Sequence, residues 1–402
     1  MKRGRQILCG VLAAALMIPL AAAAPGSGSK SLSDLQGHWA QKEIETAIAS
    51  GWVDGYPDGT FKPEKTITRA EFTKMLLDAI HLTPDSETVA WMVDAAKQRE
   101  GNYGTTSYKG KLNDMSTHWL TTQGWTQAAL YSGMVVPSDY NGGNFRPEKE
   151  IARYEIALMT DRALGLVNPA NAYAGEELPF ADNEAILDWM KGYVNEAVKA
   201  GVLQGYPDNT FRPNKTSTRA EAVVMVQRML DEMEQGLDPE GITVVAWYRE
   251  WVERTFQDPL LLEERRTTDQ IRLQVVDDVI YANLRDIYAL RQQMMENQGS
   301  PHAGANYLEW WPVEQRVDSY ITNVSNYFAF EYPMGEKEFV WENESYSTPV
   351  PLRALYEEIM VPVCDLNHPS SEPGEAWQAG WDGNTKTLTL YLPFARPIFV
   401  GS

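Results

Sequence analysis

The sequence has few cysteines, few histidines and no excess of positive charge. Two cysteines and five histidines occur in 402 residues, so a disulfide framework is excluded, and no zinc, phosphate-loop or nucleophile motif is present. The formal net charge of -20 argues against a nucleic-acid partner, because a phosphate backbone attracts a basic surface. We therefore predict no catalytic residues, no cofactor and no metal site.

The chain also lacks long apolar runs, apart from one near its start. Lys2, Arg3 and Arg5 precede the apolar stretch Ile7 to Leu20, and small residues follow at 21–24. This layout is typical of a secretory signal peptide, which we assign to residues 1–24. We expect an exported protein with no membrane span after cleavage, and with Cys364 as its one remaining cysteine.

What the chain does have is a repeat. "GYPDGTFKPEKTITRAE" at 55–71 returns as "GYPDNTFRPNKTSTRAE" at 205–221, with 13 of 17 positions identical. A more divergent copy lies between them, where "LNDMSTHW" leads to "NFRPEKEIARYE". We define unit 1 as residues 31–82, unit 2 as 111–166 and unit 3 as 178–232. One unit is too small to bury a core alone, so the three are expected to pack together.

Each unit reads as a helix, a turn-rich loop and a second helix. In unit 1 the first helix should end at Gly51, and the second should begin at the capping box formed by Thr68 and Glu71. Unit 2 has Ala152 at the capping position and therefore lacks the hydroxyl, a loss that typically costs about 1 kcal/mol.

An arginine follows the capping residue in all three units, at Arg69, Arg153 and Arg219. A cation is slightly disfavoured in the first turn of a helix. Each arginine could be exposed and paired with a neighbouring acid. The threefold recurrence beside helix N-termini favours an anion site instead, because a guanidinium can hold a carboxylate through two hydrogen bonds.

These residues resemble the S-layer homology (SLH) domain, with "TRAE" at 68–71 and 218–221 as its signature. The resemblance implies a pseudo-threefold set of helix-loop-helix units around a central bundle. It also implies non-covalent binding of a secondary cell-wall polysaccharide, often carrying pyruvate ketals, between the units. A pyruvate ketal is a carboxylate on a sugar, which agrees with the arginine argument.

The family pattern places the glycan contacts at five positions of each unit: an aspartate, a tryptophan, a glycine, the arginine and a glutamate. In this sequence the candidates are Asp34, Trp39, Gly51, Arg69, Glu71, Asp114, Trp119, Gly133, Arg153, Glu155, Asp182, Trp189, Gly201, Arg219 and Glu221. The tryptophans have an equally weighted alternative role as core anchors of the first helix. Because unit 2 has diverged, we expect its loop to form the weakest site and Arg153 to contribute least to binding.

Outside the units, residues 83–110 are expected to contain a helix of their own, and 167–177 to form a loop. We assign 240–402 to an α+β domain, so the predicted fold is a mainly α N-terminal half followed by α+β. "VVAWYREWVERTF" and residues 267–298 read as helices, and "SYITNVSNYFAFEYP" and "KEFVWENES" as strands. Residues 350–393 weakly resemble a stalk-like domain, also called copper amine oxidase N-terminal-like, in which "VPLR" begins a helix; a hairpin turn is expected at Trp381 to Asn384.

The sequence thus predicts a non-enzymatic surface protein of a bacterium, located at the cell wall or in the S-layer. Its partners would be the wall polysaccharide and other surface proteins. Two alternatives stay open: a wall-anchored glycan hydrolase using carboxylates such as Glu331, Glu336 and Glu338, or a structural subunit of a surface array.

Overall fold

The structure is a computed structural model. It describes residues 32–103, 111–173, 177–233, 242–253, 259–276 and 279–298, followed by short stretches at 306–311, 316–322, 327–333, 338–341, 344–347, 353–355, 358–365, 379–382 and 384–391. The expected signal peptide therefore lies outside the described residues. No helix in these stretches is long and apolar enough to cross a membrane.

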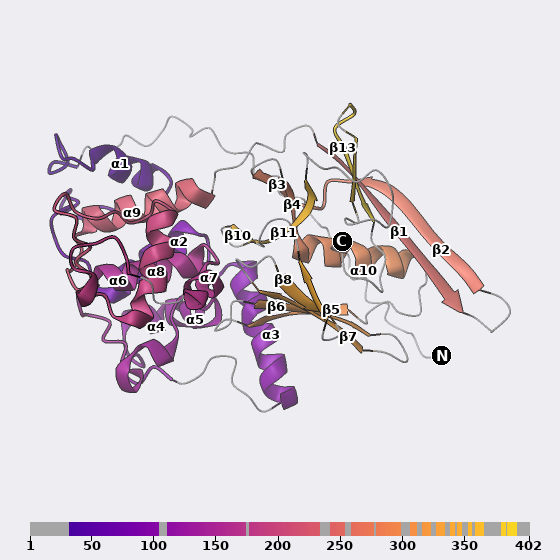
Figure 1. The fold of residues 1–402 in the computed structure, drawn as a ribbon, viewed down its shortest axis with the longest axis horizontal. Helices are drawn as coiled ribbons and strands as arrows, with labels where there is room; N and C mark the ends of the chain where they lie inside the picture. Colours follow the sequence, from indigo (N-terminus) through magenta and orange to yellow (C-terminus); the bar gives the residue numbers. More distant parts are fainter. Residues whose placement is uncertain are drawn as a thin grey trace, which may run out of the picture.

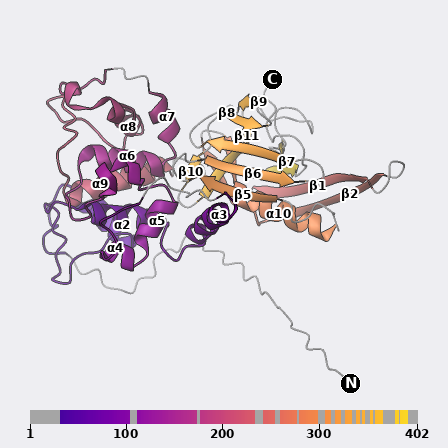
Figure 2. The same ribbon diagram turned by 90° about the horizontal axis from the view of Figure 1, so that it is seen from below.

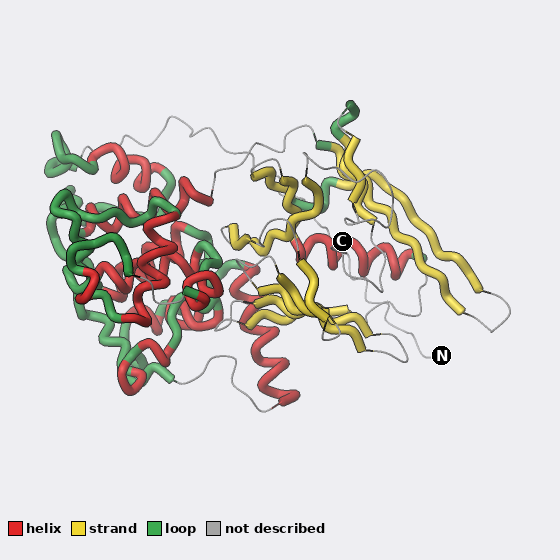
Figure 3. Tube along the Cα trace, in the orientation of Figure 1, coloured by secondary structure: helices red, strands yellow, loops and turns green. Residues whose placement is uncertain are grey.

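The N-terminal half is helical and the C-terminal half is built mainly from strands (Figures 1 and 3). This agrees with the predicted fold class of an α half followed by an α+β half. The α-helices of the first half are α1 Gln41–Ala49, α2 Arg69–Ala79, α3 Glu87–Tyr103, α4 Trp119–Thr122, α5 Trp125–Tyr131, α6 Arg153–Ala163, α7 Val167–Ala172, α8 Asp188–Lys199 and α9 Arg219–Met233. Short 3-10 turns occur at η1 Pro137–Asp139, η2 Asn141–Gly143 and η3 Asn183–Ala185.

The three units close into a ring. The first helix of each unit packs on the second helix of the preceding one: α5 on α2, α8 on α6, and α1 on α9. Isolated β-bridges join the loops just before the second helices, at Thr66–Thr218, Thr68–Glu150 and Ala152–Thr216. Helix α9 contacts both α2 and α6, so the helices that carry the arginines lie at the centre of the ring.

The second helices begin as the sequence predicts. Thr68 accepts a hydrogen bond from the Glu71 N–H (3.2 Å), and the Glu71 carboxylate accepts one from the Thr68 N–H (3.0 Å). Unit 2 keeps one of these two hydrogen bonds: the Glu155 carboxylate accepts a hydrogen bond from the Ala152 N–H (2.9 Å). Loss of the hydroxyl at residue 152 has therefore left the start of α6 in place.

Between the units, the expected independent helix in 83–110 is α3. The prediction that 167–177 is a loop was wrong in part, because α7 covers Val167–Ala172. Its packing against α8 and α6 explains the error, since tertiary contacts stabilise a short helix that has little local signal.

The C-terminal half contains thirteen described strands in three sheets, with one long helix, α10 Leu284–Asn297. The strand order is β12-β13-β1-β2 in the first sheet, β10-β11-β4-β3 in the second and β5-β6-β7-β8-β9 in the third. The strand bounds are β1 Thr243–Glu253, β2 Pro259–Thr268, β3 Leu273–Val276, β4 Val279–Asn283, β5 Asn306–Trp311, β6 Arg316–Thr322, β7 Tyr327–Pro333, β8 Glu338–Trp341, β9 Glu344–Ser347, β10 Arg353–Leu355, β11 Glu358–Asp365, β12 Ala379–Asp382 and β13 Thr387–Tyr391.

Some predictions here were confirmed and others were wrong. The strands at 316–347 and the hairpin that joins β12 to β13 are present. The stretch from Thr243 is not helical but forms β1, in which Val244 and Ala246 are buried and Val245 between them is not, the alternation of a strand. Residues 267–298 are helical only from Leu284, where the Asn283 side chain caps α10. Arg353, the one described residue of "VPLR", begins the strand β10, where a helix was expected.

Helix α3 lies between the two halves (Figure 2). It contacts β5, and Arg285 on α10 donates a hydrogen bond to the Thr88 hydroxyl (2.8 Å). The Arg285 guanidinium also lies 5.1 Å from the ring centre of Trp91. The helix inserted between units 1 and 2 thus connects the three-unit ring to the C-terminal half.

Candidate functional site

The aspartate near the start of each unit holds that unit's loop. Asp34 accepts hydrogen bonds from the N–H groups of Phe61 (2.8 Å) and Lys62 (2.7 Å). Burial alone would raise the pKa of Asp34, but these hydrogen bonds lower it below the usual value. Asp114 and Asp182 accept the same pair of hydrogen bonds in units 2 and 3. The structure therefore assigns all three carboxylates a positioning role; their contact with a glycan stays a prediction.

The loop backbone that each aspartate holds has an unusual φ angle at one residue. Lys62, Arg146 and Arg212, one in each unit, have φ values of 57°, 52° and 58°. This left-handed region is sparsely populated by residues other than glycine, and holding one there costs roughly 1–3 kcal/mol. The two N–H groups that the aspartate binds belong to this residue and to the one before it, so the carboxylate stabilises the bend.

Each of the three arginines reaches into a neighbouring unit. Arg69 donates to the Phe145 carbonyl of unit 2 (2.6 Å), and Arg153 donates to the Phe211 carbonyl of unit 3 (2.9 Å). Arg219 closes the ring by donating to the Phe61 carbonyl of unit 1 (3.1 Å). We name these contacts junction 1–2, junction 2–3 and junction 3–1. The prediction that Arg153 contributes least, because unit 2 has diverged, took each arginine with the loop of its own unit; the structure corrects that pairing.

The correction changes which arginine faces the divergent loop. The loop of unit 2 lies against Arg69, whereas Arg153 lies against the well-preserved loop of unit 3. Arg153 makes a second hydrogen bond there to the Gln204 carbonyl (2.8 Å), and Arg219 makes the equivalent bond to the Asp54 carbonyl (3.1 Å). All three arginine residues are buried, with 4% to 8% of their surface exposed.

Aromatic rings complete each junction. The Arg153 guanidinium lies 4.9 Å from the ring centres of both Tyr206 and Phe211. Arg219 lies 4.9 Å from Tyr56 and 4.6 Å from Phe61, which are the same two positions of unit 1. Such contacts stabilise a cation that has been withdrawn from water.

The junctions differ in how the positive charge is balanced. Arg69 forms an ion pair with Glu155, and both side chains are buried. The equivalent glutamates pair instead with lysines: Glu71 with Lys65 at 3.3 Å, and Glu221 with Lys215 at 2.8 Å.

Consequently, neither Arg153 nor Arg219 forms an ion pair with a carboxylate in the described part of the chain. Nη1 of Arg219 also has no hydrogen-bond acceptor there and is not fully buried. Burial lowers the pKa of Arg153 below its usual value, but an arginine stays charged at neutral pH. The charge of Glu221 and the Tyr206 hydroxyl raise the pKa of Arg153, but the effect of burial is larger. Buried charges are normally paired, so two unpaired guanidinium groups at equivalent positions indicate sites for an external anion.

The tryptophans lie at the starts of the first helices and are not core anchors in units 1 and 3. Trp39 is 61% exposed and Trp189 is 51% exposed, while Trp119 is partly buried. Exposed tryptophan faces are suited to stacking on a sugar ring. Trp189 also meets the ring of Tyr154 edge-on, with 5.6 Å between ring centres.

The three glycines have a local explanation. Gly51, Gly133 and Gly201 follow helices α1, α5 and α8 and have φ values of 82°, 80° and 71°. Glycine adopts this left-handed conformation at little cost, so these residues end helices as the sequence predicts. A glycan contact at these residues stays a prediction.

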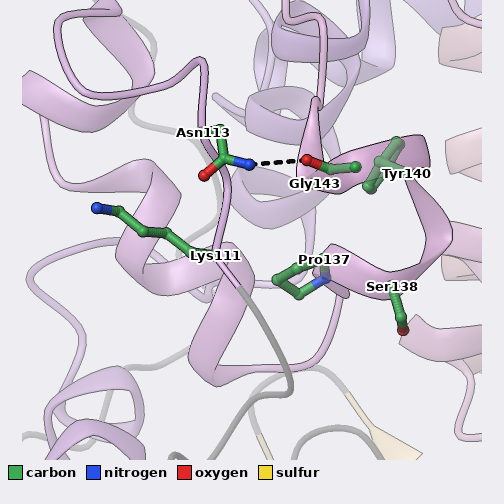
Figure 4. A pocket seen from close by; sticks show the side chains of 7 residues that line it. Lys111, Asn113, Pro137, Ser138, Tyr140 and Gly143 are labelled. Atoms are coloured by element: carbon green, nitrogen blue, oxygen red, sulfur yellow. Dashed lines mark hydrogen bonds between the residues drawn. The ribbon is translucent and has the colours of Figure 1, made fainter.

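Unit 2 also forms a small polar pocket of about 400 Å³ (Figure 4). It is lined by Lys111, Asn113, Ser138 and Tyr140 together with Pro137 and two glycines of the η1–η2 loop. Asn113 donates a hydrogen bond to the Gly142 carbonyl (2.7 Å), which ties the start of the unit to this longer loop. Its Tyr140 ring lies 5.1 Å from the Arg69 guanidinium, so the pocket adjoins junction 1–2.

Sequence reasoning missed the lysine and tyrosine that act at each of the two unpaired junctions. Lys65 donates a hydrogen bond to the Tyr56 hydroxyl (3.1 Å), and this bond, followed by the charge of Glu71, raises the lysine pKa. Lys215 lies over the Tyr206 ring in unit 3. Both pairs stand at identical positions in the two quoted repeats, which was the available signal.

Glu331 lies in β7 and Glu338 in β8, but their side chains and Glu336 lie outside the described part of the chain. In that part, no group of three or more histidine, cysteine, aspartate or glutamate residues is arranged to hold a metal ion.

Comparison with known proteins gives one matching family model, the S-layer homology domain, over residues 31–73 and 179–223. These segments lie in units 1 and 3. A cellulosome-anchoring protein of Acetivibrio thermocellus is 30% identical over 185 residues, which are 45% of this chain and 35% of the relative. The S-layer protein EA1 of Bacillus anthracis is 26% identical over 223 residues, or 55% of this chain and 22% of the relative.

Some of the similar proteins are enzymes. An amylopullulanase of Thermoanaerobacterium thermosulfurigenes is 28% identical over 204 residues, which are 50% of this chain and 10% of the enzyme. The chain thus spans only 10% to 35% of the relatives named here.

Proposed function

We propose that the three-unit ring anchors the protein to the bacterial cell wall by binding a carboxylate-bearing secondary polysaccharide, and that it presents the C-terminal half there. The S-layer homology matches and the relatives among surface proteins point to a cell-surface location and an anchoring role. The polysaccharide, its pyruvate ketal and the contact residues belong to the proposal.

The observation that carries the proposal is the pair of unpaired, buried guanidinium groups at Arg153 and Arg219. A carboxylate from outside would supply the partner that each lacks and would gain a charge-assisted hydrogen bond in a site of low dielectric constant. Nη1 of Arg219 is the donor left for it, because Nε and Nη2 already bind carbonyls.

Junction 1–2 shows what such a partner does. There the protein's own Glu155 carboxylate binds the arginine that occupies the equivalent position. A carboxylate is therefore chemically and sterically compatible with this arginine position, as a ketal-linked pyruvate would need to be. The exposed ring of Trp39 adds a surface for a neutral sugar ring.

The test is sedimentation of the mature chain with purified wall, before and after mild acid removes ketal-linked pyruvate. We expect binding to untreated wall and its loss from the treated wall. Equal binding to both would contradict the carboxylate as ligand. No binding to either would contradict the anchoring role itself.

A further inference from the structure

We infer that junction 1–2 is closed by the protein's own side chains, so that the ring holds its glycan at two sites, junction 2–3 and junction 3–1. This inference rests on the proposed function and specifies which of the three equivalent positions serve it. Three differences at junction 1–2 lead to it: an internal carboxylate, an unused lysine and an inserted aromatic ring.

The internal carboxylate comes first. Glu155 is 4% exposed, accepts the Ala152 N–H with one oxygen and binds Arg69 with the other. An incoming carboxylate would have to displace it and leave a buried negative charge without a partner. Breaking a buried pair in this way is strongly unfavourable, so a ligand should bind at least about a hundredfold more weakly here than at an unpaired arginine.

The lysine that could pair with Glu155 does not do so, which explains why Glu155 pairs with Arg69. Lys149 corresponds to Lys65 and Lys215, but it is exposed and makes no side-chain hydrogen bond or ion pair within the described stretches. In unit 1 the Tyr56 hydroxyl holds the lysine beside Glu71. In unit 2 the corresponding loop is longer. Tyr140 there lies against Phe145 (5.0 Å between ring centres) and against the Arg69 guanidinium (5.1 Å), and no hydrogen bond joins it to Lys149 in the described part of the chain.

The inserted ring is Tyr154. Units 1 and 3 have Ala70 and Ala220 at this position, and both alanines are fully buried. The Tyr154 ring meets Trp189, and its hydroxyl lies close to Arg69. A large side chain therefore contacts both Trp189 and Arg69 at this junction, where the other two junctions have only the methyl group of an alanine.

The experiment counts binding sites with a monovalent probe, a methyl hexoside carrying a 4,6-linked pyruvate ketal, by isothermal titration calorimetry on the mature chain. We expect two sites per chain. The double variant Tyr154→Ala/Glu155→Gln removes the ring and the charge but keeps the oxygen that caps α6, and it should gain a third site. The single variant Glu155→Gln is the matched control for charge alone.

A second variant, which should close an open junction, keeps the inference testable if Tyr154→Ala/Glu155→Gln does not fold. Lys215→Gln should release Glu221 to pair with Arg153 and so reduce the number of sites from two to one; thermal melts report whether each variant is folded. Three sites in the unaltered protein, or a site count that Lys215→Gln leaves at two, would overturn the closure while leaving the anchoring role intact. No probe binding at any junction would instead overturn the proposed ligand, and this inference with it.

Discussion

Asp161 provides a sharp test of the packing of the ring, because it is fully buried on α6 and neither of its carboxylate oxygens has a hydrogen-bond partner in the described part of the chain. Burial raises its pKa well above the usual value of 3.8, the charge of Glu196 raises it further, and Arg162 partly opposes both. The corresponding residue of unit 1 is Leu77, which is also fully buried. An acid thus stands in a position built for an apolar side chain.

The size of the effect follows from this burial. An unsatisfied buried polar group costs about 1–3 kcal/mol, so Asp161→Leu should raise the free energy of unfolding by about that amount even when the carboxyl is protonated. The unfolded chain releases this proton near the ordinary pKa, whereas the folded chain keeps it to higher pH. The stabilising contribution of the proton is therefore fully present below the unfolded pKa and is lost as the pH rises towards the folded pKa, at about 1.4 kcal/mol per pH unit.

Urea denaturation of the mature chain between pH 4 and pH 7 measures this dependence. Asp161→Asn is the matched control, since it keeps the shape and cannot titrate. The difference in unfolding free energy between Asp161→Asn and the unaltered protein should increase with pH over this range. Parallel pH profiles would refute the assignment of a protonated, buried Asp161.

Three further outcomes are expected. Asp182→Ala removes two charge-assisted hydrogen bonds to the unit 3 loop and should cost about 2–3 kcal/mol in urea denaturation, with faster amide exchange at Phe211; unchanged exchange would contradict the clamp. A double-mutant cycle between Arg285→Ala and Trp91→Leu should give a coupling of about 0.5–1 kcal/mol, and a coupling of zero would contradict the contact through α3. Wall affinity should change less than about tenfold between roughly 0.05 and 0.5 M salt, because a buried pair is screened weakly; a loss of several orders of magnitude would indicate diffuse surface charge instead.

The repeat made the architecture of the N-terminal half readable from the sequence. Residues that recur at a constant spacing of 150 positions predict the helices, the capping box at Thr68 and the helix end at Gly51. Each of these features depends only on residues close to it in the chain. The closure of the ring could not be predicted from local sequence patterns. Arg153 contacts a loop some 50 residues further along the chain, and no local pattern indicates which loop this is. The structure thus removes the reason for expecting Arg153 to contribute least, while its contribution to binding stays a prediction.

In the C-terminal half, local pattern was a weaker guide. Residues from Thr243 have both helical and alternating apolar spacing, and pairing makes the choice: β1 pairs with β2, which follows it closely in the chain, and with β13, more than 130 residues later. The pairing with β13 leaves no local signal, and the strand β2 was not recognised, so the helical reading of this stretch was wrong. The hairpin before β13 was readable because its turn residues lie next to one another.

The central claim is that unpaired arginines at the unit junctions hold the wall. The most direct measurement compares Arg69→Gln, Arg153→Gln and Arg219→Gln in equilibrium binding of the mature chain to purified wall, with the unfolding free energy of each variant measured alongside. We predict that Arg153→Gln and Arg219→Gln each weaken binding by at least about tenfold, as expected from loss of a charged hydrogen bond. Arg69→Gln should weaken binding least and stability most, because it leaves Glu155 buried without its partner. Binding that depends on Arg69 as strongly as on the other two, or that survives loss of both Arg153 and Arg219, would contradict the claim.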